Sequence, residues 1–181
     1  MRKKLLLHSC CGPCSTSVIE KLKDDFDITI FYYNPNIYPH EEYLKRLSEQ
    51  KRYIKESCQD IKVIDGTYDD NNKFEEFVKG FENCAEGGSR CKLCFEFRLD
   101  KVAKMAKEKM FDIFATTLSV SPHKNAKLIN QIGLDLQNKY NIEYLIADFK
   151  KQDGYLKSIQ LSKEYNLYRQ QYCGCKFSLN K

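Results

Sequence analysis

The stretch of sequence that most limits the fold is a short apolar run leading directly into a cysteine-rich turn. Residues 5–7 are leucines, Cys10, Cys11 and Cys14 follow, and Pro13 stands at the polar start of a predicted helix. A buried strand, a tight turn and a helix in this order are typical of open α/β folds. The turn at the carboxyl end of such a strand faces a crevice where ligands bind. We therefore expect these thiols to lie in a functional site.

The rest of the chain alternates between predicted strands and predicted helices. Continuous apolar runs indicate strands buried on both faces, and apolar residues at helical spacing indicate helices between them. Strands are predicted at 5–7, 28–33, 61–65, 112–120 and 142–149, and helices at 15–24, 41–57, 71–79, 90–109, 124–139 and 155–166. The alternation predicts a Rossmann-like three-layer α/β fold with a parallel sheet of about five strands. We expect residues 1–181 to form one domain, with a cysteine-bearing helix and the C-terminal tail around the site.

Composition limits what the nine cysteines can do. The chain is 42% hydrophobic and 30% charged, which is ordinary for a globular protein, and no apolar run is long enough for a membrane span. Three leucines after a basic N-terminus are too few for a signal-peptide core, so we expect a cytoplasmic protein without a membrane partner. Clustered thiols in a reducing compartment are more often metal ligands or redox groups than disulfides. The net charge of +5 favours a polyanionic partner but does not identify one.

Two pairs of cysteines have the spacing of metal ligands. Cys91 and Cys94 lie three residues apart at a predicted helix start, where both sulfurs share one side and the helix N-terminus favours negative charge. Cys10 and Cys11 supply two more thiolates from the strand-end turn. Four thiolates from two separate segments fit either tetrahedral zinc or an iron–sulfur cluster, and buried reduced thiols are the alternative.

The tail carries a different arrangement, Cys173-Gly174-Cys175. The glycine lets the backbone bend, so that a strained disulfide can form between its neighbours. Strain raises the reduction potential and makes such a bond easy to open and close, as a redox relay requires. The alternative is a loosely ordered tail with two idle thiols.

The remaining cysteines carry weaker signals. Residues 11–14 read Cys-Gly-Pro-Cys, which is also the thioredoxin motif, but a thioredoxin would be shorter and would not need a second cysteine pair on a helix. Cys14 and Cys84 are spare ligands, resolving thiols or bystanders, and we favour their interpretation as bystanders. The isolated Cys58 is interpreted as a packed core or surface thiol.

Several polar residues are candidates for the same crevice. Asp148 is predicted at a strand end, where it would ligate a metal, donate a proton or simply cap a helix. His8 lies on the first strand and is interpreted as a core histidine. Two arginines are candidates for holding a phosphate or a carboxylate, and four tyrosines for stacking on bases or packing in the core: Arg98 and Arg169; Tyr155, Tyr165, Tyr168 and Tyr172.

A series of motifs, taken together and in order, resembles a known family. They are LHSCCGPCS at 7–15, YNPNIYP at 33–39, EYLKR at 42–46, GGSRCKLCFEFRL at 87–99, TTLSVSPHK at 116–124, DFKKQDGY at 148–155 and YRQQYCGCKFS at 168–178. Their order resembles that of the cobalamin-independent epoxyqueuosine reductases of the QueH type. The resemblance covers nearly the whole chain, and the ordered set is far more specific than any one motif.

The resemblance implies the last step of queuosine synthesis, the reductive removal of the epoxide oxygen from epoxyqueuosine at the wobble position of tRNA. It also implies a 4Fe-4S cluster on the positions matching the family's ligands, and a redox-active disulfide in the tail: Cys10, Cys11, Cys91 and Cys94 for the cluster, Cys173 and Cys175 for the disulfide. The implied partners are the tRNA anticodon loop and an unidentified electron donor. An additional iron, and a role for Asp148 as its ligand, stay open.

Two other functions compete with this interpretation. An ATP-dependent tRNA thiolation-type enzyme would need a Gly/Ser-rich phosphate loop after the first strand, and Cys10-Cys11-Gly12-Pro13-Cys14 offers few glycines. A non-catalytic zinc-binding RNA module would use the same cysteines only to join segments. ATP binding separates the first alternative from a reductase, and the identity of the metal separates the second.

Overall fold

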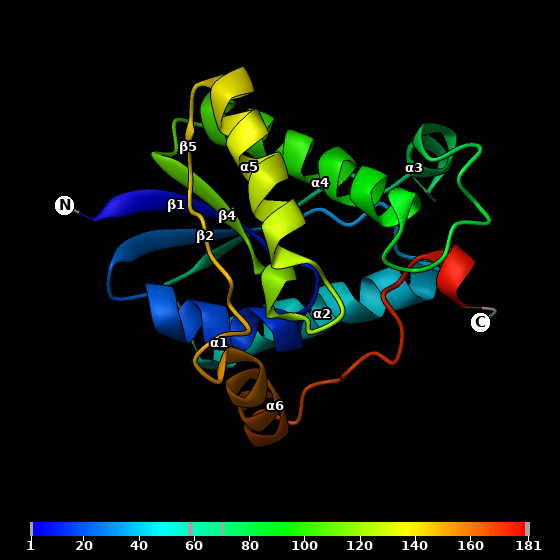
Figure 1. Ribbon diagram of the computed structural model, residues 1–181. Helices are drawn as coiled ribbons and strands as arrows, with labels where there is room; N and C mark the ends of the chain where they lie inside the picture. Colours follow the sequence, from blue (N-terminus) through cyan, green and yellow to red (C-terminus); the bar gives the residue numbers. More distant parts are fainter. Residues whose placement is uncertain (1, 58–59, 70, 180–181) are drawn as a thin grey trace.

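A computed structural model describes residues 2–57, 60–69 and 71–179. Within these residues, five parallel strands form one sheet in the order β3-β2-β1-β4-β5 (Figure 1). The strands are β1 (Lys3–His8), β2 (Phe26–Tyr32), β3 (Lys62–Asp65), β4 (Ile113–Thr116) and β5 (Glu143–Tyr144). The helices are α1 (Gly12–Leu22), α2 (His40–Ser57), α3 (Asn72–Phe77), α4 (Ser89–Glu108), α5 (Ala126–Tyr140) and α6 (Gly154–Glu164). The predicted parallel sheet of about five strands is confirmed.

The sheet is covered on both faces because its central strand is apolar on both. Along β1, Leu6 packs in a core cluster with α4 and α5, whereas Leu5 and Leu7 pack in a second cluster with α1 and α2. Figure 1 shows the same arrangement, with α4 and α5 on one face and α1, α2 and α6 on the other. Each fully buried leucine contributes roughly 1.5–3 kcal/mol to folding. The three-layer architecture is confirmed.

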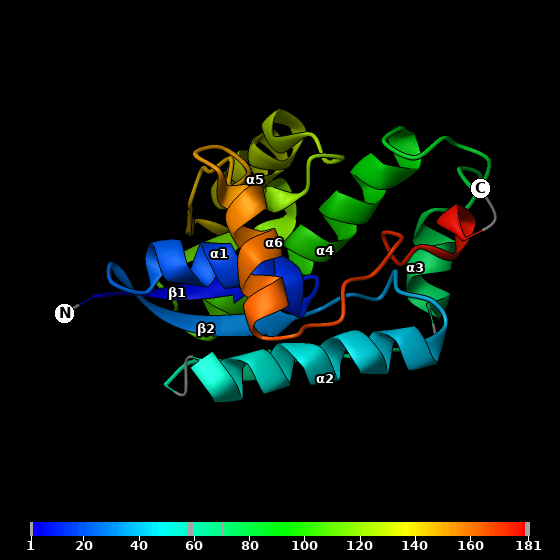
Figure 2. The same ribbon diagram turned by 90° about the horizontal axis from the view of Figure 1, so that it is seen from below.

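The strand order places a crevice beside β1. The chain continues from β1 to β2 on one side, and β4 joins β1 on the other. In open α/β sheets, ligands bind outside the carboxyl ends of the strands at such a switch point. In Figure 2 the carboxyl ends of β1 and β2 point toward the part of the molecule that holds α3 and the C-terminal tail.

Two predicted strands are shorter than expected. The prediction of a strand over 112–120 is wrong beyond Thr116, because the Thr116 hydroxyl accepts a hydrogen bond from the Leu118 amide and a 3-10 helix, Thr117–Val120, follows. The predicted strand over 142–149 is reduced to β5, so Asp148 does not lie at a strand end. Its carboxylate instead pairs with the Lys150 ammonium at 2.9 Å.

The helices carry no membrane-spanning segment within the described ranges, since none of them is both long and apolar enough to cross a bilayer.

The contact between α5 and β5 generates a stability prediction. A Cβ added at Gly133 would overlap the Tyr144 ring. We expect Gly133→Ala to lower the free energy of unfolding by about 1–3 kcal/mol through overpacking, even though alanine is the better helix former. Urea unfolding measures this change. The control is Asn138→Ala at an exposed site of the same helix, which should leave stability unchanged or slightly raised; equal stability of both variants would contradict the overpacking.

Candidate active site

Three sulfurs gather at the turn after β1. The sulfur atoms of Cys10, Cys11 and Cys14 all lie within 4.8 Å of one another, because only a short turn separates the end of β1 at His8 from the start of α1 at Gly12. Cys10 and Cys11 are buried and their sulfurs are 3.8 Å apart. The interpretation of Cys14 as a bystander did not anticipate this position. The Cys-x-x-Cys spacing of residues 11 and 14 at a helix start was the signal that pointed to it.

The three thiols do not carry equal charge. Hydrogen bonds with Cys11 and Cys14, supported by the positive charges of Lys124 and Arg98, hold the pKa of Cys10 well below its usual value despite burial. Burial and the neighbouring Cys10 raise the pKa of Cys11 to about 11. We call these three thiols the triad. Ionisation is favoured most at Cys10, and a thiolate is the form that binds metal.

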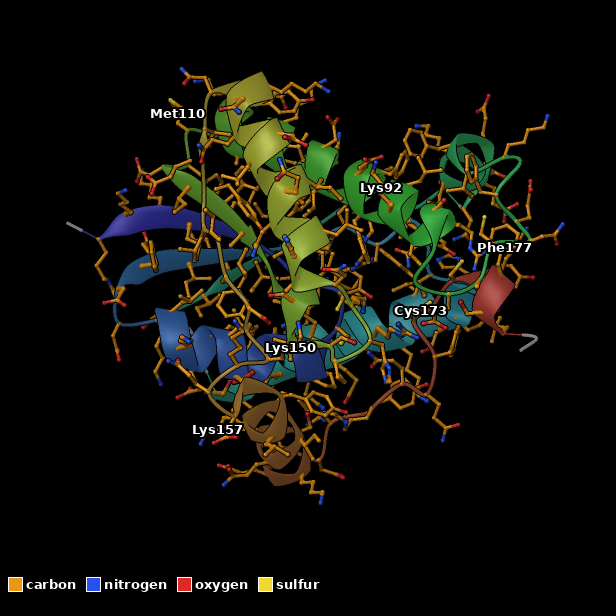
Figure 3. All side chains as sticks on the ribbon, in the orientation of Figure 1. Lys92, Met110, Lys150, Lys157, Cys173 and Phe177 are labelled. Carbon is orange, nitrogen blue, oxygen red and sulfur yellow. The ribbon has the colours of Figure 1, made fainter. Side chains whose placement is uncertain are left out.

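A pocket of about 160 Å³ opens beside the N-terminal end of α4. Its lining comes from α4, from the tail and from the segments that precede α2, α4 and α5. It includes Cys91, Cys94, Cys173, Cys175, Asn36, Arg90, Arg98, His123 and Lys124. Cys173, labelled in Figure 3, lies where the tail passes this end of α4. Cys94 and Cys175 also belong to one apolar cluster. The structure thus brings the two predicted cysteine pairs of α4 and the tail to one pocket.

The predicted ligand set is divided in the structure. Cys10 and Cys11 belong to the triad and also to the core cluster on the α4 side of the sheet. Cys91 packs against that core cluster. Within the described ranges, the triad is the one group of three or more His, Cys, Asp or Glu side chains whose ligand atoms lie close enough to share a metal ion. The tail cysteines are both free thiols, so the predicted disulfide stays a prediction.

Two cations connect the triad with the pocket. Arg98 is buried, donates to the Asn34 side-chain oxygen at 2.5 Å and approaches the Cys94 sulfur at 3.9 Å. Burial disfavours the charge on Lys124, but the interaction with the thiols of the triad, Cys10 first, outweighs burial and raises the pKa of the ammonium. Positive charge therefore faces the thiols from both α4 and the segment before α5.

Some buried polar atoms of the pocket residues have no hydrogen-bond partner within the described part of the chain. They are Asn36 Oδ1, Arg90 Nε and Arg98 Nε. Leaving a buried polar group unpaired costs free energy, and such groups in a pocket are suited to pairing with a ligand. Of these three residues, the sequence identifies only Arg98 as a candidate for ligand binding, as a phosphate or carboxylate binder.

The other polar candidates take structural positions. His8 is buried, with Nδ1 2.9 Å from Thr116 Oγ1 and Nε2 3.0 Å from the Tyr33 carbonyl, which confirms a core histidine. Burial and the charge of Arg98 lower the pKa of His8 to about 3. Arg169 donates to the Ser162 hydroxyl and the Ser158 carbonyl of α6.

The remaining candidates from the sequence are four tyrosines and one cysteine. Tyr155 and Tyr165 pack against the α1 side of the core, which favours their structural interpretation. Tyr168 and Tyr172 donate to Glu42 and to the Tyr38 carbonyl. Cys58 lies outside the described residues.

The triad generates a metal-binding prediction. Because its sulfur lies with those of Cys10 and Cys11, we expect Cys14→Ser to hold less metal than the parent protein. Iron, sulfide and zinc per chain, measured after reconstitution without oxygen, test this. Cys84→Ser is the matched control, since Cys84 is not among the pocket or triad residues. Equal metal content in both variants would return Cys14 to the role of a bystander.

Comparison with known proteins places this geometry in context. The structure resembles the U34-tRNA thiolase NcsA from Methanococcus maripaludis with its [4Fe-4S] cluster, with a TM-score of 0.54 and 13% identity over 98% of this chain and 62% of that one. This likeness concerns the fold alone, and the chain spans less than two thirds of the thiolase.

Similarity in sequence is much closer elsewhere. Epoxyqueuosine reductase QueH from Staphylococcus epidermidis is 46% identical over 99% of this chain and 78% of its own length. The protein of the same name from Staphylococcus aureus is 45% identical over 98% of this chain and 76% of its own length. The family model described as "Epoxyqueuosine reductase QueH" matches residues 5–181. The chain therefore belongs to the QueH family of epoxyqueuosine reductases.

Proposed function

We propose that this chain reduces epoxyqueuosine to queuosine in the anticodon loop of tRNA, in the cytoplasm, as a single α/β unit. Membership of the QueH family makes it an oxidoreductase of queuosine biosynthesis. The observation that carries the proposal is a group of three thiols next to a pocket lined by four more. Such a density of thiols suits a reduction, because thiolates bind redox metals and a pair of thiols can itself release two electrons.

The donor set fits an iron–sulfur cluster. Soft thiolates select iron–sulfur clusters and zinc, and the cations Arg98 and Lys124 offset the negative charge that several thiolates would gather. We propose that Cys10, Cys11, Cys91 and Cys94 hold a 4Fe-4S cluster. Cys14 is a further candidate ligand, either of this cluster or of the additional iron that stays open. The cluster would supply single electrons when it is bound.

The tail thiols complete the electron balance. Conversion of an epoxide to an alkene consumes two electrons and two protons and releases the oxygen as water. A dithiol that closes to a disulfide releases two electrons and two protons, so oxidation of Cys173 and Cys175 balances one turnover. An electron donor, as yet unidentified, then reopens the disulfide. Both thiols line the pocket in which we place the epoxide.

The chain's own charges favour departure of the oxygen. Lys124 and Arg98 line the pocket and present positive charge where negative charge develops on the leaving oxygen. The unpartnered oxygen of Asn36 is suited to accept a hydrogen bond from a hydroxyl or amino group of the modified base. A small pocket of this kind suits a single base splayed out of a loop better than a duplex, in keeping with single-stranded RNA recognition.

The first experiment separates this proposal from its competitors. The protein, purified without oxygen, is examined by visible absorption and by iron and sulfide analysis, and then assayed with tRNA containing epoxyqueuosine. Absorption that bleaches on reduction, followed by conversion of the epoxide, would support a reductase. A colourless zinc protein, even after reconstitution with iron and sulfide, would favour the zinc-binding RNA module.

The relay role of the tail makes a prediction about turnover. We expect the double variant Cys173→Ser, Cys175→Ser to lower the multiple-turnover rate roughly a hundredfold, because no dithiol remains to supply paired electrons and protons. Product is measured per chain over time, with Cys84→Ser as the control that keeps the parent rate. An unchanged rate in the double variant would exclude the relay.

The charge of Lys124 makes a separate prediction. We expect Lys124→Met to lower kcat about a hundredfold, the usual effect of removing one group that stabilises charge in a transition state. Lys127→Met is the matched control, since Lys127 is exposed on α5 and does not line the pocket. Metal content is measured in both variants, so that a loss of cluster is separated from a loss of rate. Equal kcat values for both variants, at equal metal content, would contradict the role.

A further inference from the structure

The C-terminal tail runs alongside α2 (Figure 2). Polar side chains of that helix hold it. Arg52 donates to the carbonyls of Tyr165 and Asn166 at 3.1 and 3.0 Å. Three residues earlier, the Glu49 carboxylate accepts the Tyr168 amide at 2.7 Å. Three residues before that, Arg46 donates to the carbonyls of Tyr172 and Cys173 at 3.1 and 3.2 Å. This spacing puts the three side chains along one side of the helix.

Arg46 is the most enclosed of these contacts. Its side chain is 2% exposed, and its two terminal nitrogens bind consecutive carbonyls of the tail. Its Nε donates to Glu42 at 2.6 Å, and its guanidinium lies 5.1 Å from the centre of the Tyr172 ring. A planar fork with fixed donors is what allows one side chain to make all these contacts together.

The turn that follows is fixed from its other side. Gly174 has a φ of +106°, and a Cβ added there would lie 2.9 Å from Ile37 and 3.1 Å from an Arg46 nitrogen. The Gly174 carbonyl accepts the Tyr38 amide at 2.8 Å, and Ile37 forms a β-bridge with Cys175. The backbone of Cys173-Gly174-Cys175 is therefore held between Arg46 and the segment after β2.

We propose that Arg46 is a positioning residue that holds the tail pair in its dithiol conformation and so makes the Cys173–Cys175 disulfide easy to reduce. The inference rests on the proposed function, in which this pair is the redox relay. Both cysteines are free thiols in the structure, so the Arg46 contacts belong to the dithiol form. Closure forms the S–S bond and releases two electrons and two protons, and it must bend a backbone whose carbonyls Arg46 holds. Contacts made only by the dithiol oppose closure and favour reopening.

The test measures the equilibrium between dithiol and disulfide in the metal-loaded enzyme. The enzyme is equilibrated without oxygen in buffers of different ratios of reduced to oxidised glutathione, alkylated and cleaved with trypsin. Cleavage after Arg169 and Lys176 releases residues 170–176, which contain both tail cysteines and no other. The mass of this peptide distinguishes the alkylated dithiol from the disulfide.

We expect Arg46→Met to shift the equilibrium constant about tenfold toward the disulfide, the effect of losing roughly one charged hydrogen bond. Arg46→Lys should shift it similarly, because lysine restores the charge but not the fork. The double variant Glu42→Gln, Arg46→Met removes the ion pair as a unit, so that no buried carboxylate is left uncompensated to disturb folding. It should show the same shift.

Arg52→Met is the matched control. Arg52 lies on the same helix and also binds two tail carbonyls, but these precede the cysteine pair. Its equilibrium constant should equal that of the parent. The proposal is overturned if both variants that contain Arg46→Met have the equilibrium constant of the parent, or if Arg46→Lys restores that constant fully. It is also overturned if Arg52→Met shifts the constant equally, or if the tail of the parent forms no disulfide at any glutathione ratio. Epoxide turnover plays no part in this readout, so a failed tRNA assay would count against the proposed function alone.

Discussion

The site depends on a chain of buried hydrogen bonds that fixes the carboxyl end of β1. His8, the last residue of that strand, contacts Thr116 of β4 and the carbonyl of Tyr33, the residue that follows β2. Asn34 then donates to the Ser9 carbonyl at 2.9 Å and accepts from Arg98 of α4. Each of these polar groups would cost free energy if it were buried alone. Satisfied together, they tie three strands and a helix to the turn that carries Cys10 and Cys11.

This arrangement also explains the charge of the site. His8 stays neutral, since burial and Arg98 lower its pKa to about 3. The positive charge of the region therefore comes from Arg98 and Lys124, which do not depend on a histidine proton. Hydrogen bonds with Cys11 and Cys14, together with these cations, lower the pKa of Cys10 and favour its ionisation. A cluster of thiolates needs such permanent positive charge, because several like charges in a buried site repel one another.

Periodicity in the sequence predicts the elements that bury apolar surface, and spacing predicts the cysteine pairs. The apolar run before Cys10 and the alternation of strands and helices are local signals, so β1, α1 and the order of elements follow from them. The early end of β4 depends on one Thr116 hydroxyl that caps a 3-10 turn, which no periodicity reveals. Arg46 is a charged residue within a polar helix, which sequence reasoning assigns to the surface. It is buried because the tail returns to it from more than a hundred residues away.

The turn after β1 limits which ligand can bind at this place in the fold. A fold supplies a crevice, and the residues at its rim decide the chemistry. A phosphate bound after β1 would need free amide groups at the start of α1, but Pro13 contributes none and Gly12 is packed so closely that its Cβ would lie 3.3 Å from the Glu49 carbonyl. The three sulfurs of the triad already occupy this turn. A turn that offers thiolates in place of amide groups is suited to binding soft metal ions and to electron transfer. The nearby pocket is completed by two further thiols from a tail that α2 holds in place.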